Sequence, residues 1–256
     1  MKLAVSGKGG VGKTTLTALL ARRLVKEGRK VLAVDADPDP NLAATLEFPK
    51  PERIVPLVEM RELIAERMGT TPGAVGAYFK LNPKVDDLPE KYCIEHEGLR
   101  LIVMGMKREG GTGCACPENA FLRALLDHLI LSADEDLLVD MEAGLEHLGR
   151  ATASSVDGLV VVVEPGLRSV ETLTRIRRLA SDIGLQRCWP VANKVSSDED
   201  RAFLSEAVSD SDLVAFVPTS GELAAAGRDK ASLRVAGEGV WQAVDLVLER
   251  IQADLS

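Results

Sequence analysis

The sequence predicts an α/β fold in which helices cover both faces of a doubly wound, mostly parallel sheet. Short, almost purely apolar runs alternate with longer segments of helical periodicity along the whole chain. Apolar runs as short as 158–163 are typical of parallel strands that are buried on both faces. No linker, repeat or low-complexity tract interrupts the alternation, so residues 1–256 are predicted to form a single domain.

The periodicity assigns the individual elements. Strands are expected at 3–6, 30–35, 99–104, 137–140, 158–163, 188–193 and 213–217. Helices are expected at 13–27, 117–131, 169–183, 198–208 and 239–255. Residues 92–95 and 99–104 are predicted to form a hairpin that enters the sheet. Six prolines between 47 and 91 leave room for one helix at about 58–68, and this stretch is interpreted as an insertion over the sheet edge.

Composition argues against several classes of partner. The 31 basic and 39 acidic residues give a net charge of -8, and only 4% of residues are aromatic, which disfavours a nucleic-acid surface. No apolar run approaches the length of a membrane span, and the first residues lead directly into a strand. The four cysteines are too few for a disulfide framework. We therefore expect a protein of the reducing cytoplasm that binds neither nucleic acid nor membranes.

A glycine-rich segment at 7–15 joins the first predicted strand to the first predicted helix. It fits the phosphate-binding pattern G-x-x-x-x-G-K-[ST] through Gly7, Gly12, Lys13 and Thr14. Its backbone N–H groups and the helix start are expected to surround the phosphates, with Lys13 at the terminal phosphates and Thr14 as a magnesium ligand. Lys8 adds a second positive charge inside the loop. The residues predicted to contact nucleotide here are Gly7, Lys8, Gly9, Gly10, Val11, Gly12, Lys13, Thr14 and Thr15.

Carboxylates follow two of the predicted strands, at the edge where ligands bind in parallel sheets. Asp37 comes just after the strand at 30–35, and we interpret it as the residue that orients the attacking water. Asp140 ends the strand at 137–140 and is predicted to belong to the magnesium shell. Gly144 lies shortly beyond it, where a close approach to the γ-phosphate needs a residue without a side chain.

Two cysteines separated by one residue precede the helix at 117–131. In an extended segment this spacing places the thiols of Cys114 and Cys116 on the same side. A thiolate at a helix start is stabilised by the helix dipole, and thiolates bind soft metals. Two ligands do not complete a site, but a twofold dimer would supply four sulfurs, which suits zinc or square-planar nickel. Cys93 and Cys188 are interpreted as structural.

The pairing of Lys8 with Lys13 resembles the deviant phosphate-loop ATPases, the superfamily of MinD, ParA and the nitrogenase iron protein. Together with the segments 113–119 and 140–150, the chain is similar to the CooC family. These are accessory ATPases for the maturation of nickel carbon monoxide dehydrogenase, with a related branch that serves acetyl-CoA synthase. The likeness extends over essentially the whole chain, although its motifs lie between residues 6 and 150.

This resemblance implies a homodimer that uses ATP and Mg2+, binds Ni2+ between its subunits through Cys114 and Cys116, and serves the apo form of a nickel enzyme. Zn2+ is the alternative metal. The resemblance also implies that Lys8 contacts the nucleotide of the partner subunit. It further implies that Asn193 lies on the adenine side of the nucleotide. Residues 219–222 depart from the acidic stretch that is usual in the family, which weakens the argument for base binding there.

Three other functions compete with this interpretation. An iron–sulfur reductase like the nitrogenase iron protein needs well-separated cluster cysteines, whereas Cys114 and Cys116 are nearly adjacent. A positioning ATPase of the MinD or ParA type needs a basic patch or a basic amphipathic tail, and the final predicted helix carries acidic residues instead. A regulatory switch with slow hydrolysis is the third alternative.

Overall fold

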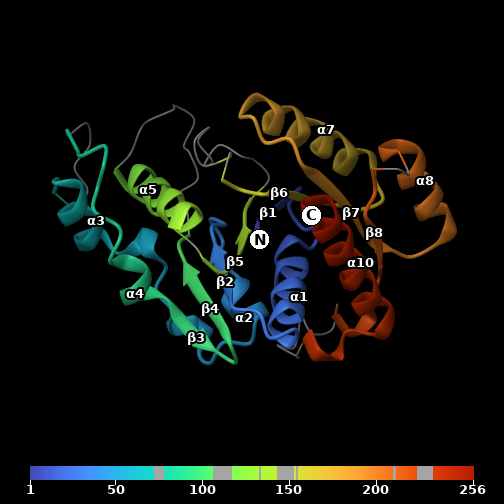
Figure 1. Cartoon of the computed structure of the whole chain (residues 1–256), viewed down its shortest axis with the longest axis horizontal. Helices are drawn as coiled ribbons and strands as arrows, with labels where there is room; N and C mark the ends of the chain where they lie inside the picture. The colour runs from blue at the N-terminus through green and yellow to red at the C-terminus, as the bar shows by residue number, and fades with distance from the viewer. Residues whose placement is uncertain are drawn as a thin grey trace.

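A computed structural model describes residues 1–71, 78–105, 117–132, 134–142, 153, 155–209, 212–223 and 233–256. Its strands form one eight-stranded sheet of order β3-β4-β2-β5-β1-β6-β7-β8 (Figure 1). The strands are β1 (Lys2–Gly7), β2 (Val31–Asp35), β3 (Ile94–His96), β4 (Leu99–Val103), β5 (Asp136–Asp140), β6 (Gly158–Val163), β7 (Cys188–Val195) and β8 (Ala215–Pro218). Every neighbouring pair is parallel except β3 and β4. The predicted hairpin and the mostly parallel sheet are therefore confirmed.

Helices lie on both faces of this sheet. Within the described residues they are α1 (Lys13–Lys26), α2 (Leu42–Thr45), α3 (Arg61–Met68), α4 (Leu88–Tyr92), α5 (Pro117–Ser132), α7 (Leu167–Asp182), α8 (Asp198–Val208) and α10 (Glu238–Leu255). Short 3-10 helices occur at Pro51–Arg53, Leu57–Glu59 and Leu233–Val235. The helices that contribute to one apolar cluster are α1, α2 and α10, whereas α3, α4, α5, α7 and α8 contribute to another.

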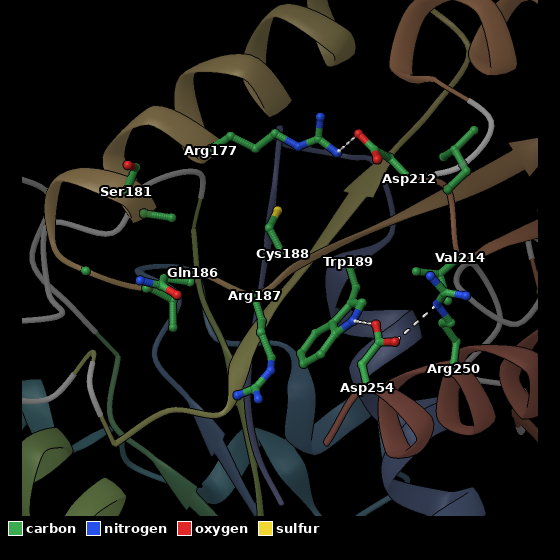
Figure 2. Close-up of a pocket in the computed structure, with 14 residues that line it drawn as sticks. Arg177, Ser181, Gln186, Arg187, Cys188, Trp189, Asp212, Val214, Arg250 and Asp254 are labelled. Carbon is green, nitrogen blue, oxygen red and sulfur yellow. Dashed lines mark hydrogen bonds and ion pairs between the residues drawn. The ribbon is translucent and has the colours of Figure 1, made fainter. Parts of the chain in front are cut away.

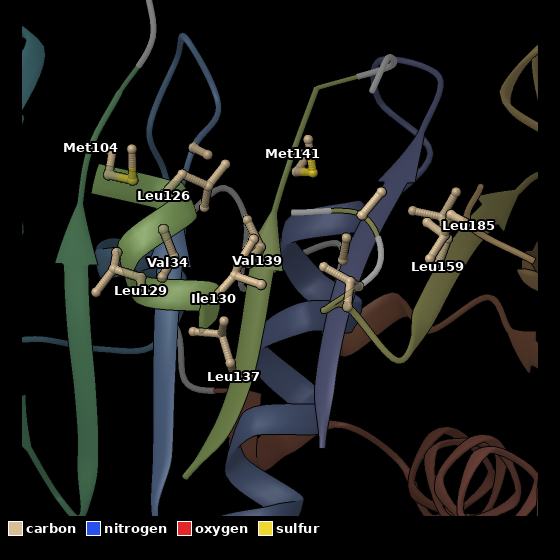
Figure 3. Packing of buried hydrophobic residues seen from close by; sticks show 14 of the residues in the cluster. Val34, Met104, Leu126, Leu129, Ile130, Leu137, Val139, Met141, Leu159 and Leu185 are labelled. Atoms are coloured by element: carbon tan, nitrogen blue, oxygen red, sulfur yellow. The ribbon is translucent and has the colours of Figure 1, made fainter. Parts of the chain in front are cut away.

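The alternation of side chains along β1 shows how the sheet separates these two clusters. Leu3 and Val5 belong to the cluster of α1 and α10, and Ala4 between them belongs to the cluster of α5 and α7. Both faces are covered, so the strands are apolar throughout rather than alternating with polar residues. In Figure 3, Leu126 and Ile130 of α5 lie against Val139 of β5.

The insertion at 47–91 extends the second cluster over the sheet edge. Leu57, Ile64 and Leu88 are at most 2% exposed and belong to the cluster of α5. The predicted helix at 58–68 is wrong at its start, because residues 57–59 form a 3-10 turn and Met60 has a ψ of 68°. The α-helix therefore begins only at Arg61, and it ends at Gly69 with a positive φ.

Candidate nucleotide site

The phosphate loop lies between β1 and α1, at the edge of the sheet where the parallel strands end. Its first glycine, Gly7, has a φ of 151°, and a Cβ there would lie 2.5 Å from the carbonyl oxygen of Val162. Its last glycine, Gly12, has a φ of 99°, and a Cβ there would lie 2.4 Å from Asn193 Nδ2. By contrast, Cβ atoms at Gly9 and Gly10 would meet nothing within 4 Å. The loop thus packs tightly at its two ends and is open between them, where the phosphates are predicted to bind.

The predicted magnesium residues lie around a buried carboxylate. Asp140 ends β5, which lies between β1 and β2, and its side chain is fully buried. Neither carboxylate oxygen of Asp140 has a hydrogen-bond partner in the described part of the protein. Burial raises the pKa of Asp140 to about 7, although Thr14 and then Lys13 act in the opposite direction. Buried polar atoms without partners are rare in proteins and need an explanation.

A magnesium ion fits this centre. The two carboxylate oxygens of Asp140 provide hard, anionic ligands, and hydrogen bonding by the Thr14 side chain acts to lower the pKa of the same carboxyl group. Asp140 and Thr14 are the described residues that would hold the ion. When bound, Mg2+ would supply positive charge to the phosphate oxygens, as it does in phosphoryl transfer generally.

A second buried carboxylate shapes the segment that carries Asp37. Asp35 is fully buried, and its Oδ2 accepts a 2.8 Å hydrogen bond from the N–H of Leu42. Its Oδ1 accepts a 3.3 Å bond from the N–H of Asp37. Burial and then the charge of Asp140 raise the pKa of Asp35 to about 7. The predictions assigned no role to Asp35, which anchors this segment at both ends.

Asp37, the predicted water-orienting residue, is half-buried at the same edge of the sheet. Its Oδ1 accepts a 2.9 Å hydrogen bond from the N–H of Asp39, so the side chain is held by its own turn. The structure brings Asp37 close enough to Asp140 for its charge to raise the pKa of that carboxyl. The catalytic role of Asp37 remains a prediction.

The end of β7 contacts the phosphate loop directly. Asn193 Nδ2 donates a 2.7 Å hydrogen bond to the carbonyl oxygen of Val11. Lys194 has a φ of 58° beside a register shift between Ala192 and Val195, and its Nζ donates to the carbonyl oxygen of Gly10. A bulge of this kind re-aims the side chains of a strand. In this structure Asn193 therefore supports the loop itself, and its predicted position beside adenine stays a prediction.

Lys8 is the remaining charged residue of the loop. Its Nζ lies 3.6 Å from Glu164 Oε1, and Glu164 directly follows β6. Lys194 Nζ lies 3.3 Å from the other oxygen of Glu164. Neither Glu164 nor Lys194 was among the predicted site residues. Glu164 follows β6, which lies beside β1, and Lys194 lies near the end of β7, the next strand along the sheet.

The predicted nickel ligands, Cys114 and Cys116, lie outside the described residues, as does Gly144. Within the part that the structure describes, no three His, Cys, Asp or Glu side chains are grouped so that they could hold a metal ion. Cys93 and Cys188 are half-buried free thiols, and burial raises the pKa of each. Neither described cysteine has the low pKa that a reactive thiol needs.

A separate pocket of about 620 Å3 lies at the start of β7 (Figure 2), whereas Asn193 lies near the end of that strand. Its charges are largely paired within the pocket. Arg177 lies 3.0 Å from Asp212, and Asp254 accepts a 2.8 Å hydrogen bond from the indole of Trp189. Arg250 contacts the other oxygen of Asp254 at 3.5 Å. The Trp189–Asp254 bond joins β7 to α10, and the Arg177–Asp212 pair joins α7 to the segment before β8. These contacts give no indication of a nucleotide site.

Comparison with known proteins identifies the family. The model of the CobQ/CobB/MinD/ParA nucleotide-binding domain matches residues 2–233. The carbon monoxide dehydrogenase accessory protein CooC of Rhodospirillum rubrum is 44% identical over 235 residues, which cover 91% of this chain and 88% of CooC. The chain belongs to the CobQ/CobB/MinD/ParA family, in its CooC branch. As a CooC-family protein it is a P-loop ATPase, which confirms the predicted enzyme class.

Other relatives agree with this CooC-family assignment. An uncharacterized ATP-binding protein of Methanocaldococcus jannaschii is 45% identical over 226 residues, which cover 87% of each chain. Among solved structures, MinD of Aquifex aeolicus superposes with a TM-score of 0.68 at 20% identity, covering 99% of this chain and 97% of MinD. At that identity the likeness shows the fold alone, and it confirms the predicted fold class. No described helix is long and apolar enough to cross a bilayer.

Proposed function

We propose that this chain is a nucleotide-dependent homodimeric ATPase that binds nickel and assists its insertion into the apo form of a nickel enzyme such as carbon monoxide dehydrogenase. The 44% identity to CooC of Rhodospirillum rubrum, which is named a carbon monoxide dehydrogenase accessory protein, carries the proposal. The open phosphate loop and the unpaired carboxylate of Asp140 support its ATP- and magnesium-dependent part. MinD of Pyrococcus horikoshii, which has the same fold, is complexed with Mg-ADP.

In the proposed reaction each residue near the loop has one task. Lys13, only 7% exposed, neutralises charge on the terminal phosphates, and Lys8 of the partner subunit adds a second positive charge. Thr14 and Asp140 hold the magnesium ion, as their positions allow. Asp37 orients the attacking water. The support of Gly10 and Val11 by Lys194 and Asn193 keeps the loop in one place, so the donors are ordered before the nucleotide arrives.

Nickel is the cargo in this proposal. Cys114 and Cys116 of two subunits would surround one ion with four sulfurs, and the same ligand set accepts zinc. Because each thiol must lose its proton to bind, metal uptake should release protons and weaken as the pH falls. A shared ion should also promote association of the subunits without ATP.

The test is a nickel titration of the purified protein with its mass read by sedimentation. We expect one ion per dimer, and metal-induced association, in the wild-type protein. Cys114→Ser and Cys116→Ser should each lose tight binding, whereas Cys93→Ser, a matched change at a half-buried thiol, should retain it. Tight binding of one ion per monomer that survives Cys114→Ser would refute the shared site.

The same preparation separates the proposal from the two main alternatives. An iron–sulfur reductase would show the visible absorption of a bound cluster, whereas a nickel or zinc dithiolate site of a CooC-type protein carries no iron by elemental analysis. A positioning ATPase would sediment with anionic vesicles or DNA at low salt. The net charge of -8 predicts no such binding.

A further inference from the structure

Glu164 occupies a position that the sheet fixes with respect to the phosphate loop. β6 pairs in parallel with β1, with Gly7 opposite Val162, so the residues that follow the two strands emerge side by side. The N–H of Glu164 donates a 3.0 Å hydrogen bond to Oγ of Ser169, which is 2% exposed at the start of α7. The backbone of Glu164 is thus held at both ends, by β6 and by α7.

The carboxylate of Glu164 lies between two lysines. Lys8 Nζ lies 3.6 Å from Oε1, and Lys194 Nζ lies 3.3 Å from Oε2. Lys194 is held in turn by the carbonyl oxygen of Gly10. One acidic side chain therefore joins the loop lysine, the loop backbone and the end of β7.

The two contacts differ in how readily they can break. Lys194 makes a second bond to the loop, whereas no other contact is described for the ammonium of Lys8. The side chains of Lys8 and Glu164 are 38% and 26% exposed. Ion pairs this exposed change equilibria only by factors of about two to five, so Lys8 can leave Glu164 without disturbing the fold.

We propose that Glu164 is a positioning residue that holds Lys8 against its own subunit until nucleotide-bound subunits associate. In this arrangement the carboxylate gives Lys8 a negative partner in the separate subunit, and the phosphates of the partner's nucleotide replace it in the dimer. Association then carries the cost of breaking the Lys8–Glu164 pair. This inference rests on the proposed action of Lys8 across the dimer interface.

The resting contact can be tested in the separate, nucleotide-free subunit. Trace labelling with an amine-reactive reagent, read by mass spectrometry, measures the availability of Lys8 relative to exposed Lys26. Glu164→Gln keeps the size of the side chain but removes its charge, and it should raise the relative labelling of Lys8 by about two- to fivefold. Glu171→Gln, at an exposed position on α7 without a described ion pair, is the matched control and should leave it unchanged.

The consequence for the reaction is tested by association with a non-hydrolysable ATP analogue. Glu164→Gln should lower the dissociation constant of the dimer by about two- to fivefold relative to both the wild type and Glu171→Gln. This difference should shrink at 0.5 M salt, where the Debye length is about 4 Å, because screening already weakens the Lys8–Glu164 pair in the wild type. Nucleotide affinity of the separate subunit should not change. If Glu164→Gln and Glu171→Gln tightened the dimer equally, the cause would be the change in net charge, and the inference would be overturned. Analogue-driven association that is unaltered by Glu164→Gln would do the same.

These outcomes are distinguishable from failure of the proposed function. If the wild-type protein does not associate with the analogue at all, the trans role of Lys8 fails, and the inference about Glu164 fails with it. If the wild type associates but the labelling of Lys8 does not respond to Glu164→Gln, only the inference about Glu164 is overturned.

Discussion

Asp140→Asn is expected to stabilise the nucleotide-free protein at alkaline pH while it abolishes ATP hydrolysis. The carboxyl of Asp140 is fully buried with both oxygens unpaired, and its pKa rises from 3.8 to about 7. Below about pH 4 the group is protonated in both the folded and the unfolded chain, so it contributes nothing to the pH dependence. Between pH 4 and pH 7 only the folded chain retains the proton, and the free energy of unfolding falls as the pH rises. Above pH 7 the full cost of the buried charge is present.

The size of this effect follows from the pKa values. A rise from 3.8 to about 7 corresponds to a cost of about 4 kcal/mol at pH 8. Asparagine removes that cost, but its amide is left buried without a partner, which costs about 1–3 kcal/mol at any pH. At pH 4.5 about 1 kcal/mol of the cost is already present, because the unfolded chain has lost most of its proton while the folded chain keeps it. We therefore expect Asp140→Asn to be about 2 kcal/mol more stable than the wild type at pH 8 and about 1 kcal/mol less stable at pH 4.5.

Urea unfolding at the two pH values, with EDTA and no nucleotide, measures this difference. Asp136→Asn is the matched control, because Asp136 is a buried carboxylate at the other end of β5 that accepts a 2.6 Å hydrogen bond from Arg29. That variant removes the negative charge that pairs with Arg29 and with the N-terminal ammonium of Met1, and it should be destabilised at pH 8. If Asp140→Asn changed the unfolding free energy equally at pH 4.5 and pH 8, the argument from buried charge would be refuted.

Three further predictions concern the loop and the core. Lys13→Ala should keep its far-UV circular dichroism but lose ATP hydrolysis by orders of magnitude, and near-normal turnover would contradict the phosphate-loop assignment. Lys8→Ala should still bind ATP yet lose ATP-dependent association in sedimentation, and mixing it with Asp37→Asn should restore some ATP hydrolysis. Unchanged association of Lys8→Ala would show that the lysine is only solvated. Gly158→Ala would place a Cβ 2.1 Å from the Trp189 ring, so urea unfolding should show a loss of about 1–3 kcal/mol, and a neutral result would mean that β6 shifts.

The sheet was predictable because its strands are buried on both faces. A run such as Gly158–Val163 has one plausible environment, the centre of a parallel sheet, and the structure places it there. The insertion at 47–91 was predicted less well. Its 3-10 turn at Leu57–Glu59 and the four-residue α2 depend on packing against neighbouring segments, and such short pieces have no periodicity to detect.

In the nucleotide site, residues that belong to one continuous segment were predicted, whereas residues that reach the site from distant parts of the chain were not. Residues 7–15 carry their own pattern, so the loop could be predicted from one segment. Glu164 and Lys194 reach the loop from more than 150 residues away, through the register of β6 and β7, and no local pattern marks them. Asp35 was visible in the sequence beside Asp37, but only its burial shows that it is the anchor of the two.

The left-handed backbone of Lys194 sets two demands that no single residue meets equally well. A φ of 58° favours glycine or asparagine, whereas the contacts to Gly10 and Glu164 need a long cation. A saturation library at this position would therefore rank its members differently under two selections. Selection for protease resistance would enrich glycine, and selection for ATP turnover would return lysine. At this position of the bulge, the residue that the contacts to the phosphate loop require is not the one that folding alone would favour.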